Sequence, residues 1–530
     1  MTSTTSPPAP TTPAPARLAT GQAAGIGLAA TVLGVGAGQL VAGLFSPSSA
    51  PLLAVGDRVI NLSPQPLVEF ATSTFGTADK AVLIAGIVVL LVVVGAVAGL
   101  VSRRDERPGS GVLAGLGVVG VAAVATGSSF GPLDLLAPAA ALFSAVWAFR
   151  RLHRVGLRAG RQREPAAGLT RRRLLAAGSA AGLGGLLAGA AGVGLGSGLS
   201  ATGGPAASRD AVTRRLATAT VTRAPALPPG VDLPDAGVTR FATANADFYR
   251  IDTALRVPSL TAESWRLRVH GMVARELDIG FDDLMRRPLV ERWVTMTCVS
   301  NEVGGDLVSN ARFVGVDLRE LLLEAGPLPG ADQVLSTSTD GWTAGSPTSV
   351  LLEPGRGALL AVGMNGEALP REHGFPVRIV VPGLYGYVSA TKWLEQIELT
   401  TFADRQAYWI DQGWGVLGPI KTGARIDVPG AFASVPAGPV TIAGSAWSQP
   451  RGISRVEVRV DGGPWQEASL AATPGGDTWR MWKAVLDLPA GRPTVECRAT
   501  DADGSTQTDQ RADPIPDGAT GWPSRRFTVG

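Results

Sequence analysis

The chain has 530 residues, of which 45% are hydrophobic and only 17% are charged, and its formal net charge is +3. This length predicts roughly two to four units rather than one domain. The small net charge, with arginines gathered beside apolar segments, is typical of a membrane protein and excludes nucleic acid as a partner. Two cysteines allow at most one disulfide, which excludes a disulfide-stapled secreted scaffold.

The N-terminal 200 residues contain the long apolar segments. Residues 1–16 are rich in Pro, Thr and Ala, which predicts a disordered tail. Residues 17–200 are expected to form an α-helical membrane bundle, because about 20 apolar residues suffice to cross the hydrocarbon core. Five spans are predicted, at residues 22–45, 81–101, 111–127, 132–149 and 174–199.

Basic residues set the expected orientation of this bundle. Residues 102–109 carry three arginines and residues 150–173 carry nine, whereas residues 46–80 hold only one arginine and one lysine. We therefore expect the arginine-rich segments and the N-terminus to be cytoplasmic. An odd number of spans then places everything after residue 200 on the outer face of the membrane.

The start of the fifth span, LTRRRLLAAG, has two interpretations. Thr170, Arg171 and Arg172, followed by leucines and a weakly hydrophobic Gly/Ala run, resemble a twin-arginine export signal placed inside the chain. That pathway exports proteins already folded around a cofactor. A plain anchor with a basic cytoplasmic flank explains the same residues. Both interpretations place the C-terminal region outside, and neither decides whether the helix is cleaved.

Three further regions follow the membrane segments. Residues 201–240 are rich in Ala, Pro and Thr, which predicts a linker. From 241 to 425, alternating runs such as WRLRVHGMV and PVRIVVPG mix with short helical patterns, which predicts an α+β domain. From 426 to 530, alternating runs separated by turn signals predict an immunoglobulin-like β-sandwich.

Cys298 closes the strand-like run RWVTMTC and opens the polar loop VSNEVGG. A cysteine in a strand is most often a small core residue, and Cys497 fits that description. Cys298 could instead face a cleft, as a nucleophile or as a thiolate ligand of a soft or high-valent metal. The chain has three histidines and no CxxC motif, so zinc is disfavoured and a metal would have to arrive within an organic cofactor.

A second group of polar residues lies in 365–393, where His373, Arg378 and Lys392 surround a strand and a glycine-containing loop. Arg378 and Lys392 could bind a phosphate, with loop N–H groups as further donors. Taken alone, the group fits a basic surface loop as well. A phosphate-bearing cofactor that presents a metal would need both this group and Cys298.

These residues lie within a stretch, about 245 to 400, that resembles the molybdopterin domain of the sulfite oxidase family. The motifs TCVSN, STDGW, LLAVGMNGEALPREHGFPVRIVVPGLYG and TKW follow the order and spacing of that family. The later stretches AWSQPRGISRVEVRVDGGPW and TWRMWKAVLDLPAGRPTVECRATDADG resemble its immunoglobulin-like dimerisation domain. The resemblance implies a molybdopterin-dependent oxidoreductase that transfers an oxygen atom at a molybdenum centre. The membrane region lies outside this resemblance. From the resemblance together with the predicted spans and their orientation, we expect a membrane-anchored bacterial form whose catalytic region faces outward from the cytoplasmic membrane.

The resemblance also implies roles for individual residues. It implies that the Cys298 thiolate ligates molybdenum beside the two dithiolene sulfurs of the pterin, so that no second protein ligand is needed. It further implies that molybdenum–molybdopterin is contacted by Asn245, Phe248, Tyr249, Cys298, Ser338, His373, Arg378, Ser389, Ala390, Thr391 and Lys392.

Three positions depart from the sulfite oxidase pattern. Asp252 and Glu302 stand where that family has arginines, and Trp414 stands where it has its active-site tyrosine. Arg250 or Arg256 could supply a positive charge nearby. Sulfite is a small dianion that needs convergent arginines, so a neutral S-oxide or N-oxide, or an organic sulfur compound, suits such a pocket better. The predicted catalytic residues are Cys298, Glu302 and Trp414.

Two alternatives stay open at this point: sulfite oxidation proper, and a non-catalytic outward-facing binding module that keeps the fold. Haem is not expected in this chain, because there is no CxxCH motif and the three histidines are scattered. The expected partners are a small-molecule substrate, a separate cytochrome or membrane electron carrier, the lipid bilayer and, through the C-terminal domain, a second copy of the chain.

Overall fold

The computed structural model describes residues 17–46, 49–64, 67, 70–71, 74–75, 78–127, 131–161, 166–198, 204–255 and 257–530. The predicted disordered tail, residues 1–16, lies outside the described residues. The chain divides into two compact units, Met1–Ser200 and Ala201–Gly530.

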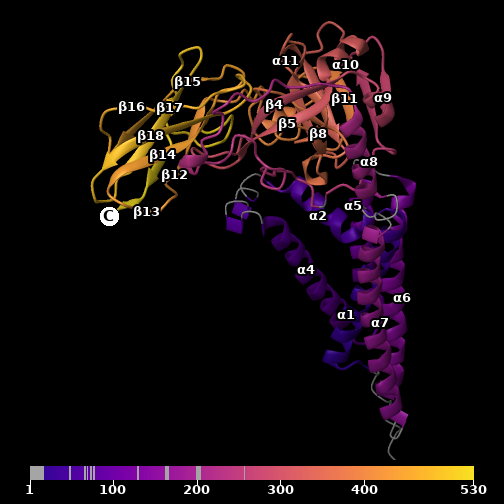
Figure 1. Ribbon diagram of the computed structural model, residues 1–530. Coiled ribbons are helices and arrows are strands. Elements are labelled where there is room, and N and C mark those ends of the chain that lie inside the picture. The colour runs from indigo at the N-terminus through magenta and orange to yellow at the C-terminus, as the bar shows by residue number, and fades with distance from the viewer. Residues whose placement is uncertain are drawn as a thin grey trace, which may run out of the picture. The chain divides into compact units, whose positions relative to one another are not determined.

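The first unit is helical (Figure 1). Its elements are α1 (Thr20–Phe45), α2 (Pro51–Leu62), α4 (Asp79–Val101), α5 (Arg107–Ala125), the 3-10 helix η3 (Pro132–Leu135), α6 (Leu136–Arg161) and α7 (Ala166–Gly198). Five segments of the described part are long and apolar enough to cross a membrane: Thr20–Phe45, Asp79–Val101, Arg107–Ala125, Pro132–Arg158 and Ala176–Val193. The expectation of five apolar helices is confirmed.

The arginine-rich segment 150–173, which follows the fourth predicted span, is mostly helical. Helix α6 continues to Arg161, and α7 starts at Ala166. Ala, Leu and Arg are strong helix formers, and no proline interrupts residues 150–161. His153 is therefore a buried residue of α6.

Helices α1 and α7 pack with their backbones in contact. A Cβ built at Gly36 would fall on the carbonyl oxygen of Gly185, and one built at Gly43 would fall on that of Gly192. The contacts recur seven residues apart on each helix, from 36 to 43 and from 185 to 192, which is about two turns. Glycine is required at these positions because a larger side chain would push the two helices apart.

The second unit begins with two sheets that share one hydrophobic core (Figure 1). One sheet has the order β1–β4–β5–β8–β10, and β9 pairs with β8. The other has the order β3–β2–β11–β6–β7. The strands of the first sheet are β1 (Val221–Thr222), β4 (Leu289–Thr297), β5 (Val308–Asp317), β8 (Leu359–Met364), β9 (Glu367–Ala368) and β10 (Arg378–Val380). Those of the second are β2 (Arg266–Gly271), β3 (Leu277–Gly280), β6 (Gln333–Ser338), β7 (Thr343–Pro347) and β11 (Leu394–Thr400).

Short helices join these strands. They are α9 (Phe281–Met285), α10 (Leu318–Ala325), α11 (Thr348–Leu351), α12 (Gly386–Ser389) and the 3-10 helices η4 (Pro234–Ala236) and η5 (Arg371–His373). Helix α10 shows why such segments are short. Its N-cap Asp317 accepts a hydrogen bond from the N–H of Arg319, and Gly326 ends the helix in the left-handed region.

The segment predicted as a linker, residues 201–240, contains ordered structure that belongs to this unit. Helix α8 (Pro205–Thr218) buries Val212 and Leu216 in the core of the two sheets. Arg209 donates hydrogen bonds to the carbonyl oxygens of Ala368 and Leu369. Strand β1 then pairs in parallel with β4. Two apolar residues four positions apart are a weak helical pattern, which the Ala/Pro/Thr composition obscures.

The C-terminal region is built from antiparallel sheets. One sheet has the order β12–β14–β18–β17 and another β16–β15–β19–β20, while β13 and β21 form a parallel pair. Their bounds are β12 (Gly423–Val428), β13 (Ser434–Val435), β14 (Gly438–Trp447), β15 (Ile453–Val460), β16 (Gln466–Glu467), β17 (Ser469–Leu470), β18 (Arg480–Leu488), β19 (Thr494–Asp501), β20 (Ser524–Arg526) and β21 (Thr528–Val529). Inward residues of the two larger sheets form one core, as in a β-sandwich.

The predicted boundary between residues 425 and 426 falls inside β12, whose Ala424 and Ile426 both pack in the sandwich core. The predicted fold class is confirmed: an apolar helical region, a mixed α/β region and C-terminal antiparallel sheets.

Candidate active site

Strand β4 delivers Cys298 to a tight polar loop. The N–H of Cys298 donates to the carbonyl oxygen of Leu307 (2.9 Å), and its carbonyl oxygen accepts from the N–H of Asn301 (3.1 Å). The Asn301 side chain closes the loop by accepting from the N–H of Leu307 (2.9 Å). The thiol is therefore held at a fixed place, with only 8% of Cys298 exposed.

Burial raises the pKa of the Cys298 thiol, although hydrogen bonds from Ser300 and the positive charge of Lys392 act in the opposite direction. In the free protein the sulfur is accordingly a thiol, and binding to a metal would deprotonate it. No group of three or more His, Cys, Asp or Glu side chains in the described part of the chain could hold a metal ion. A metal at Cys298 must therefore bring its other ligands.

Aromatic residues place His373 beside the segment that contains Asn245. The Phe248 ring stacks on Tyr249 at 5.4 Å and meets the edge of the His373 ring at 5.4 Å. His373 Nε2 donates to the carbonyl oxygen of Asn245 (3.1 Å). Burial, together with the charges of Arg378 and Lys392, lowers the pKa of His373 to about 4. His373 is thus neutral at physiological pH, and its Nδ1 is an acceptor.

Arg378 is a buried cation that lacks a carboxylate partner among the described residues. Its guanidinium donates to the carbonyl oxygens of His373 (3.2 Å) and Ala390 (3.4 Å). Burial lowers the pKa of Arg378 to about 10. Burial likewise raises the pKa of nearby Tyr249, and the positive charge of Arg378 opposes that rise. A buried guanidinium held only by neutral carbonyls leaves room for an anionic ligand.

Lys392 lies in the same cluster but has a carboxylate partner. Its Nζ donates to Asp252 Oδ2 (2.9 Å) and to the carbonyl oxygen of Glu372 (3.2 Å). The same Asp252 oxygen accepts from Arg250 Nε (2.9 Å). Burial lowers the pKa of Lys392 to about 8, and Asp252 opposes that shift. The sequence indicated Asp252 as a departure from the family pattern, but it did not predict this ion pair.

The remaining predicted contacts differ in how their hydroxyls are used. Ser338 Oγ is buried without a hydrogen-bond partner among the described residues, as are Thr339 Oγ1 and Arg371 Nε. Ser389 instead donates to the carbonyl oxygen of Tyr385 (2.9 Å). Thr391 shares a hydrogen bond with Ser336 (2.6 Å), and the Ala390 carbonyl is the acceptor of Arg378 noted above.

These residues fit a pterin cofactor that carries a phosphate. The buried groups without partners could bind polar atoms of a ligand, and Arg378 provides a positive charge that no described carboxylate neutralises. A single thiol at Cys298 matches a metal whose other sulfurs come from the cofactor. Burial of an unneutralised cation is costly in a protein without a ligand, which is why this arrangement indicates an anion site.

The structure separates the other two predicted catalytic residues. Glu302 is exposed and lines a cleft between the Cys298 loop and the sandwich, together with Thr297, Tyr385 and Lys421. Trp414 is not among the residues that line this cleft. It is buried against Tyr387 and Trp409 at ring distances of 5.8 and 6.1 Å, in a cluster that also includes Tyr408. Trp414 Nε1 has no hydrogen-bond partner in the described part of the chain.

Sequence reasoning missed Tyr385 and Thr297. Tyr385 is buried next to α12, its hydroxyl accepts from the N–H of Lys421 (3.4 Å), and burial raises its pKa to about 12. Thr297 precedes Cys298, lines the cleft and has a buried hydroxyl without a partner among the described residues. The signal that could have found them is their position, because Thr297 opens the motif TCVSN and Tyr385 lies in the motif that ends in VVPGLYG. Arg256, considered as an alternative positive charge, lies outside the described residues.

Comparisons with known proteins agree with the chemistry of this site. Residues 254–409 match the family model "Oxidoreductase molybdopterin binding domain". Sulfite oxidase of Gallus gallus is 31% identical over 323 residues, which cover 52% of this chain and 69% of that protein. Mitochondrial sulfite oxidase of Homo sapiens is 30% identical over 305 residues, 48% of this chain and 55% of that protein.

More distant proteins share the same region. Nitrate reductase [NADH] 1 of Oryza sativa subsp. japonica is 27% identical over 319 residues, 48% of this chain and 34% of that protein. Among solved structures, the sulfane dehydrogenase SoxCD from Paracoccus pantotrophus aligns with a TM-score of 0.48 and 22% identity, over 57% of this chain and 88% of that one. This chain thus spans little more than half the length of the mammalian relatives.

Proposed function

Since this chain belongs to the sulfite oxidase family of molybdopterin oxidoreductases, we propose that it catalyses oxygen-atom transfer on a neutral S-oxide, N-oxide or organic sulfur compound. The observation that carries the substrate class is Asp252. It stands where sulfite oxidases have an arginine, and it holds both Lys392 and Arg250 in ion pairs. Asp252 contributes one negative charge beside these two cations, so the three groups carry a net charge of +1, whereas an arginine at position 252 would make it +3. The site therefore offers less positive charge to a sulfite dianion.

We assign Cys298 as the molybdenum ligand and the cluster around Arg378 as the cofactor site. Arg378 and the unpartnered hydroxyl of Ser338 would hold polar and anionic parts of the cofactor, while neutral His373 offers an acceptor. When bound, molybdenum–molybdopterin supplies the oxygen-atom transfer chemistry and stores the electrons. The protein's own contribution is one thiolate, charge compensation and exclusion of water.

Two surfaces are candidates for substrate contact. Glu302 faces the cleft beside the Cys298 loop, where Thr297 has a buried hydroxyl without a partner among the described residues and Lys421 is paired with Asp517 (2.7 Å). Trp414 offers a buried indole N–H that could donate to the oxygen of an S-oxide or N-oxide. We therefore assign both residues to substrate recognition, Glu302 from the cleft and Trp414 from the buried aromatic cluster.

The five apolar helices support a multi-pass membrane protein. From the distribution of arginines we propose that the catalytic unit lies on the outer face of a bacterial cytoplasmic membrane. Because no haem-binding motif is present in the sequence, we propose that a separate cytochrome or membrane electron carrier exchanges electrons with the site. Stoichiometric haem in the purified chain would contradict this assignment.

The first experiment is metal and pterin analysis of the full chain purified from a host that makes the cofactor. We expect molybdenum in the wild type and in Cys497→Ala, a matched control because Cys497 is also a buried free thiol. Cys298→Ala should lose molybdenum and turnover while keeping its circular dichroism spectrum. Full metal content and turnover in Cys298→Ala would overturn the ligand role. Absence of molybdenum from the wild type would instead favour a non-catalytic binding module.

Sulfite oxidation is the second candidate, because the curated relatives are named sulfite oxidases. The two candidates are separated by assaying sulfite with ferricyanide and S-oxides or N-oxides with a reduced viologen. We expect turnover of a neutral compound, and we expect Asp252→Arg to shift the preference toward sulfite. Sulfite turnover at lower concentration than any neutral compound, unimproved by Asp252→Arg, would overturn the proposed substrate class.

A further inference from the structure

Thr295 is a fully buried residue of β4, three positions before Cys298. On one side it lies opposite Asn310 of β5. On the other side β1 pairs with Leu289 and Val290, and no strand among the described residues lies beside the end of β4 that leads to Cys298. A buried strand edge still needs partners for its N–H and C=O groups.

The C-terminal sandwich supplies those partners. The N–H of Thr295 donates to the carbonyl oxygen of Asp477 (2.9 Å), and its carbonyl oxygen accepts from Gln449 Nε2 (2.9 Å). The hydroxyl of Thr295 accepts from the N–H of Trp479 (2.7 Å) and donates to Asn310 Oδ1 (3.0 Å). Three of these four hydrogen bonds come from the sandwich, so Thr295 is the point where the sandwich holds the cysteine strand.

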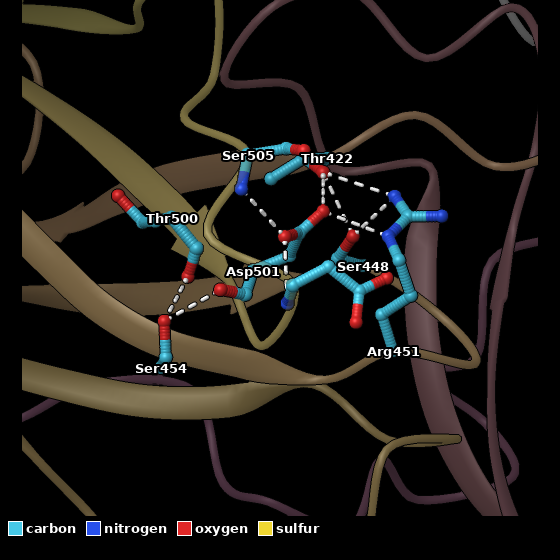
Figure 2. Close-up of polar contacts among 8 residues, drawn as sticks. Thr422, Ser448, Arg451, Ser454, Thr500, Asp501 and Ser505 are labelled. Carbon is cyan, nitrogen blue, oxygen red and sulfur yellow. Dashed lines mark hydrogen bonds and ion pairs between the residues drawn. The ribbon is translucent and has the colours of Figure 1, made fainter.

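The sandwich groups that reach Thr295 are themselves fixed. Gln449 lies in the turn between β14 and β15, whose flanks are tied to Asp501 (Figure 2). Arg451 donates to Asp501 Oδ2 (2.7 Å) and to Ser448 Oγ (2.7 Å), and Ser448 shares a hydrogen bond with Thr422 (2.7 Å). These hydrogen bonds fix the turn and therefore the position of the Gln449 side-chain amide.

Trp479 is anchored in the same way on the other side of Thr295. Its ring is 1% exposed, and Nε1 donates to the carbonyl oxygen of Phe241 (2.9 Å). The side chain of Asn310 donates to that same carbonyl oxygen (2.9 Å). Thr295, Trp479, Asn310 and Phe241 thus form a closed, buried network, which removes freedom from the end of β4.

We propose that Thr295 is a positioning residue for Cys298: through it, the C-terminal sandwich fixes the end of β4 and hence the place of the thiolate. This inference rests on the proposed function, in which Cys298 ligates the metal. A single protein ligand has no second ligand to correct its position, so its location depends on the strand that carries it. The sandwich then contributes to the active site without supplying an atom to it.

The test compares Thr295→Val with Thr295→Ser in the full chain. Valine keeps the shape but removes the hydroxyl that pairs with the Trp479 N–H and with Asn310 Oδ1, whereas serine keeps this hydroxyl. In cofactor-free protein, we expect iodoacetamide to alkylate Cys298 about tenfold faster in Thr295→Val than in the wild type. The reason is that an unpaired buried polar group favours local opening by about that factor. Peptide mass spectrometry measures the rate of alkylation. Thr295→Ser should behave as the wild type.

Thr500→Val is the matched control. Its hydroxyl is bonded to Thr506 within the sandwich (2.9 Å), so the same chemical change should leave Cys298 reactivity unaltered. If Thr295→Val does not fold, Gln449→Leu carries the test. It removes the donor to the Thr295 carbonyl, and Gln449 Oε1 has no partner among the described residues, so little else is lost. We expect a smaller increase in Cys298 alkylation there.

Molybdenum-loaded protein gives the second readout. The EPR signal of the metal should broaden or shift in Thr295→Val and return to the wild-type form in Thr295→Ser. Wild-type alkylation rates and spectra in both Thr295→Val and Gln449→Leu would overturn the inference. A failure of the proposed function gives a different result, because Cys298→Ala would then keep its metal. The alkylation result in cofactor-free protein does not depend on the metal and could still hold.

Discussion

Replacing Arg378 with methionine tests the anion site most directly. Arg378 is 4% exposed and has only backbone carbonyls as hydrogen-bond partners in the described structure. Methionine fills a similar volume without a charge. In cofactor-free protein the substitution removes a buried cation that nothing neutralises, whereas in loaded protein it removes the partner of the proposed phosphate.

The size of the effect follows from the pKa of Arg378. Burial lowers it from 12.5 to about 10, and each pKa unit corresponds to about 1.4 kcal/mol, so the buried charge costs about 3 kcal/mol. Arg378 is charged in the folded and unfolded chain at neutral pH, so this cost reduces the free energy of unfolding. The bonds to His373 and Ala390 offset about 1 kcal/mol of it. Arg378→Met should therefore stabilise cofactor-free protein by about 2 kcal/mol.

The assay is thermal unfolding of detergent-solubilised full chain from a host that lacks the pterin pathway. A gain of about 2 kcal/mol corresponds to a rise of about 4 °C in the midpoint for a unit of this size. Arg425→Met is the matched control, because Arg425 is equally buried but paired with Asp427 at 2.5 Å. That variant should lose stability, since it leaves a carboxylate without its partner.

Loaded protein should respond in the opposite direction. Arg378→Met from a cofactor-producing host should contain little pterin and little molybdenum. A lower midpoint for cofactor-free Arg378→Met than for the wild type would show that Arg378 is a structural residue. Full cofactor content in the same variant would refute its role in anion binding.

Three further outcomes are expected. The pKa of His373 is about 4 in the folded chain and near 6.5 in the unfolded chain. The free energy of unfolding of cofactor-free wild type should therefore fall by about 3 kcal/mol as pH falls from 6.5 to 4. In urea unfolding, the stability of His373→Gln should depend less on pH. Burial would raise the pKa of Asp501, but bonds from Arg451, Ser505 and Asp503 lower it overall. Its stabilisation is therefore present above pH about 4 and lost as pH falls through its lower folded pKa, so the destabilisation by Asp501→Asn should be largest at pH 7 and should shrink as pH falls below about 4 in the same urea assay. Gly36→Leu should reduce the amount of full-length protein in membranes, whereas Gly25→Leu, where a Cβ meets no atom within 4 Å, should not; equal amounts on immunoblots would contradict the α1–α7 packing.

Much of the fold could be predicted from the sequence because its signals are local. Apolar runs of about 20 residues predict the helices, and alternating runs predict the strands. Helix α8 escaped prediction because its buried face, formed by Pro205, Ser208, Val212 and Leu216, has two large aliphatic residues, Val212 and Leu216. Those residues become informative only once the sheet that covers them is known.

The sequence singled out Cys298 and Arg378 because each lies in a local motif, and the structure shows both side chains buried. Pairings between distant segments were not predictable, since no local pattern records them. Asp252 and Lys392 are 140 residues apart, and Gln449 and Thr295 are 154 apart. Glu302 and Trp414 were expected in one pocket because both depart from the family pattern. Such a departure does not show which way a side chain faces, so the sequence could not predict that the two residues lie in different surroundings.

The glycine contacts between α1 and α7 bear on what becomes of the fifth helix after insertion. A signal helix that is cleaved after export does not need close backbone packing against another helix. Removal of α7 would also expose the α1 backbone at Gly36 and Gly43 to lipid tails. We propose that α7 is instead retained as a membrane anchor. An enzyme held in this way searches a plane rather than a volume, so carriers that diffuse in the same bilayer would meet it far more often than soluble ones of equal abundance.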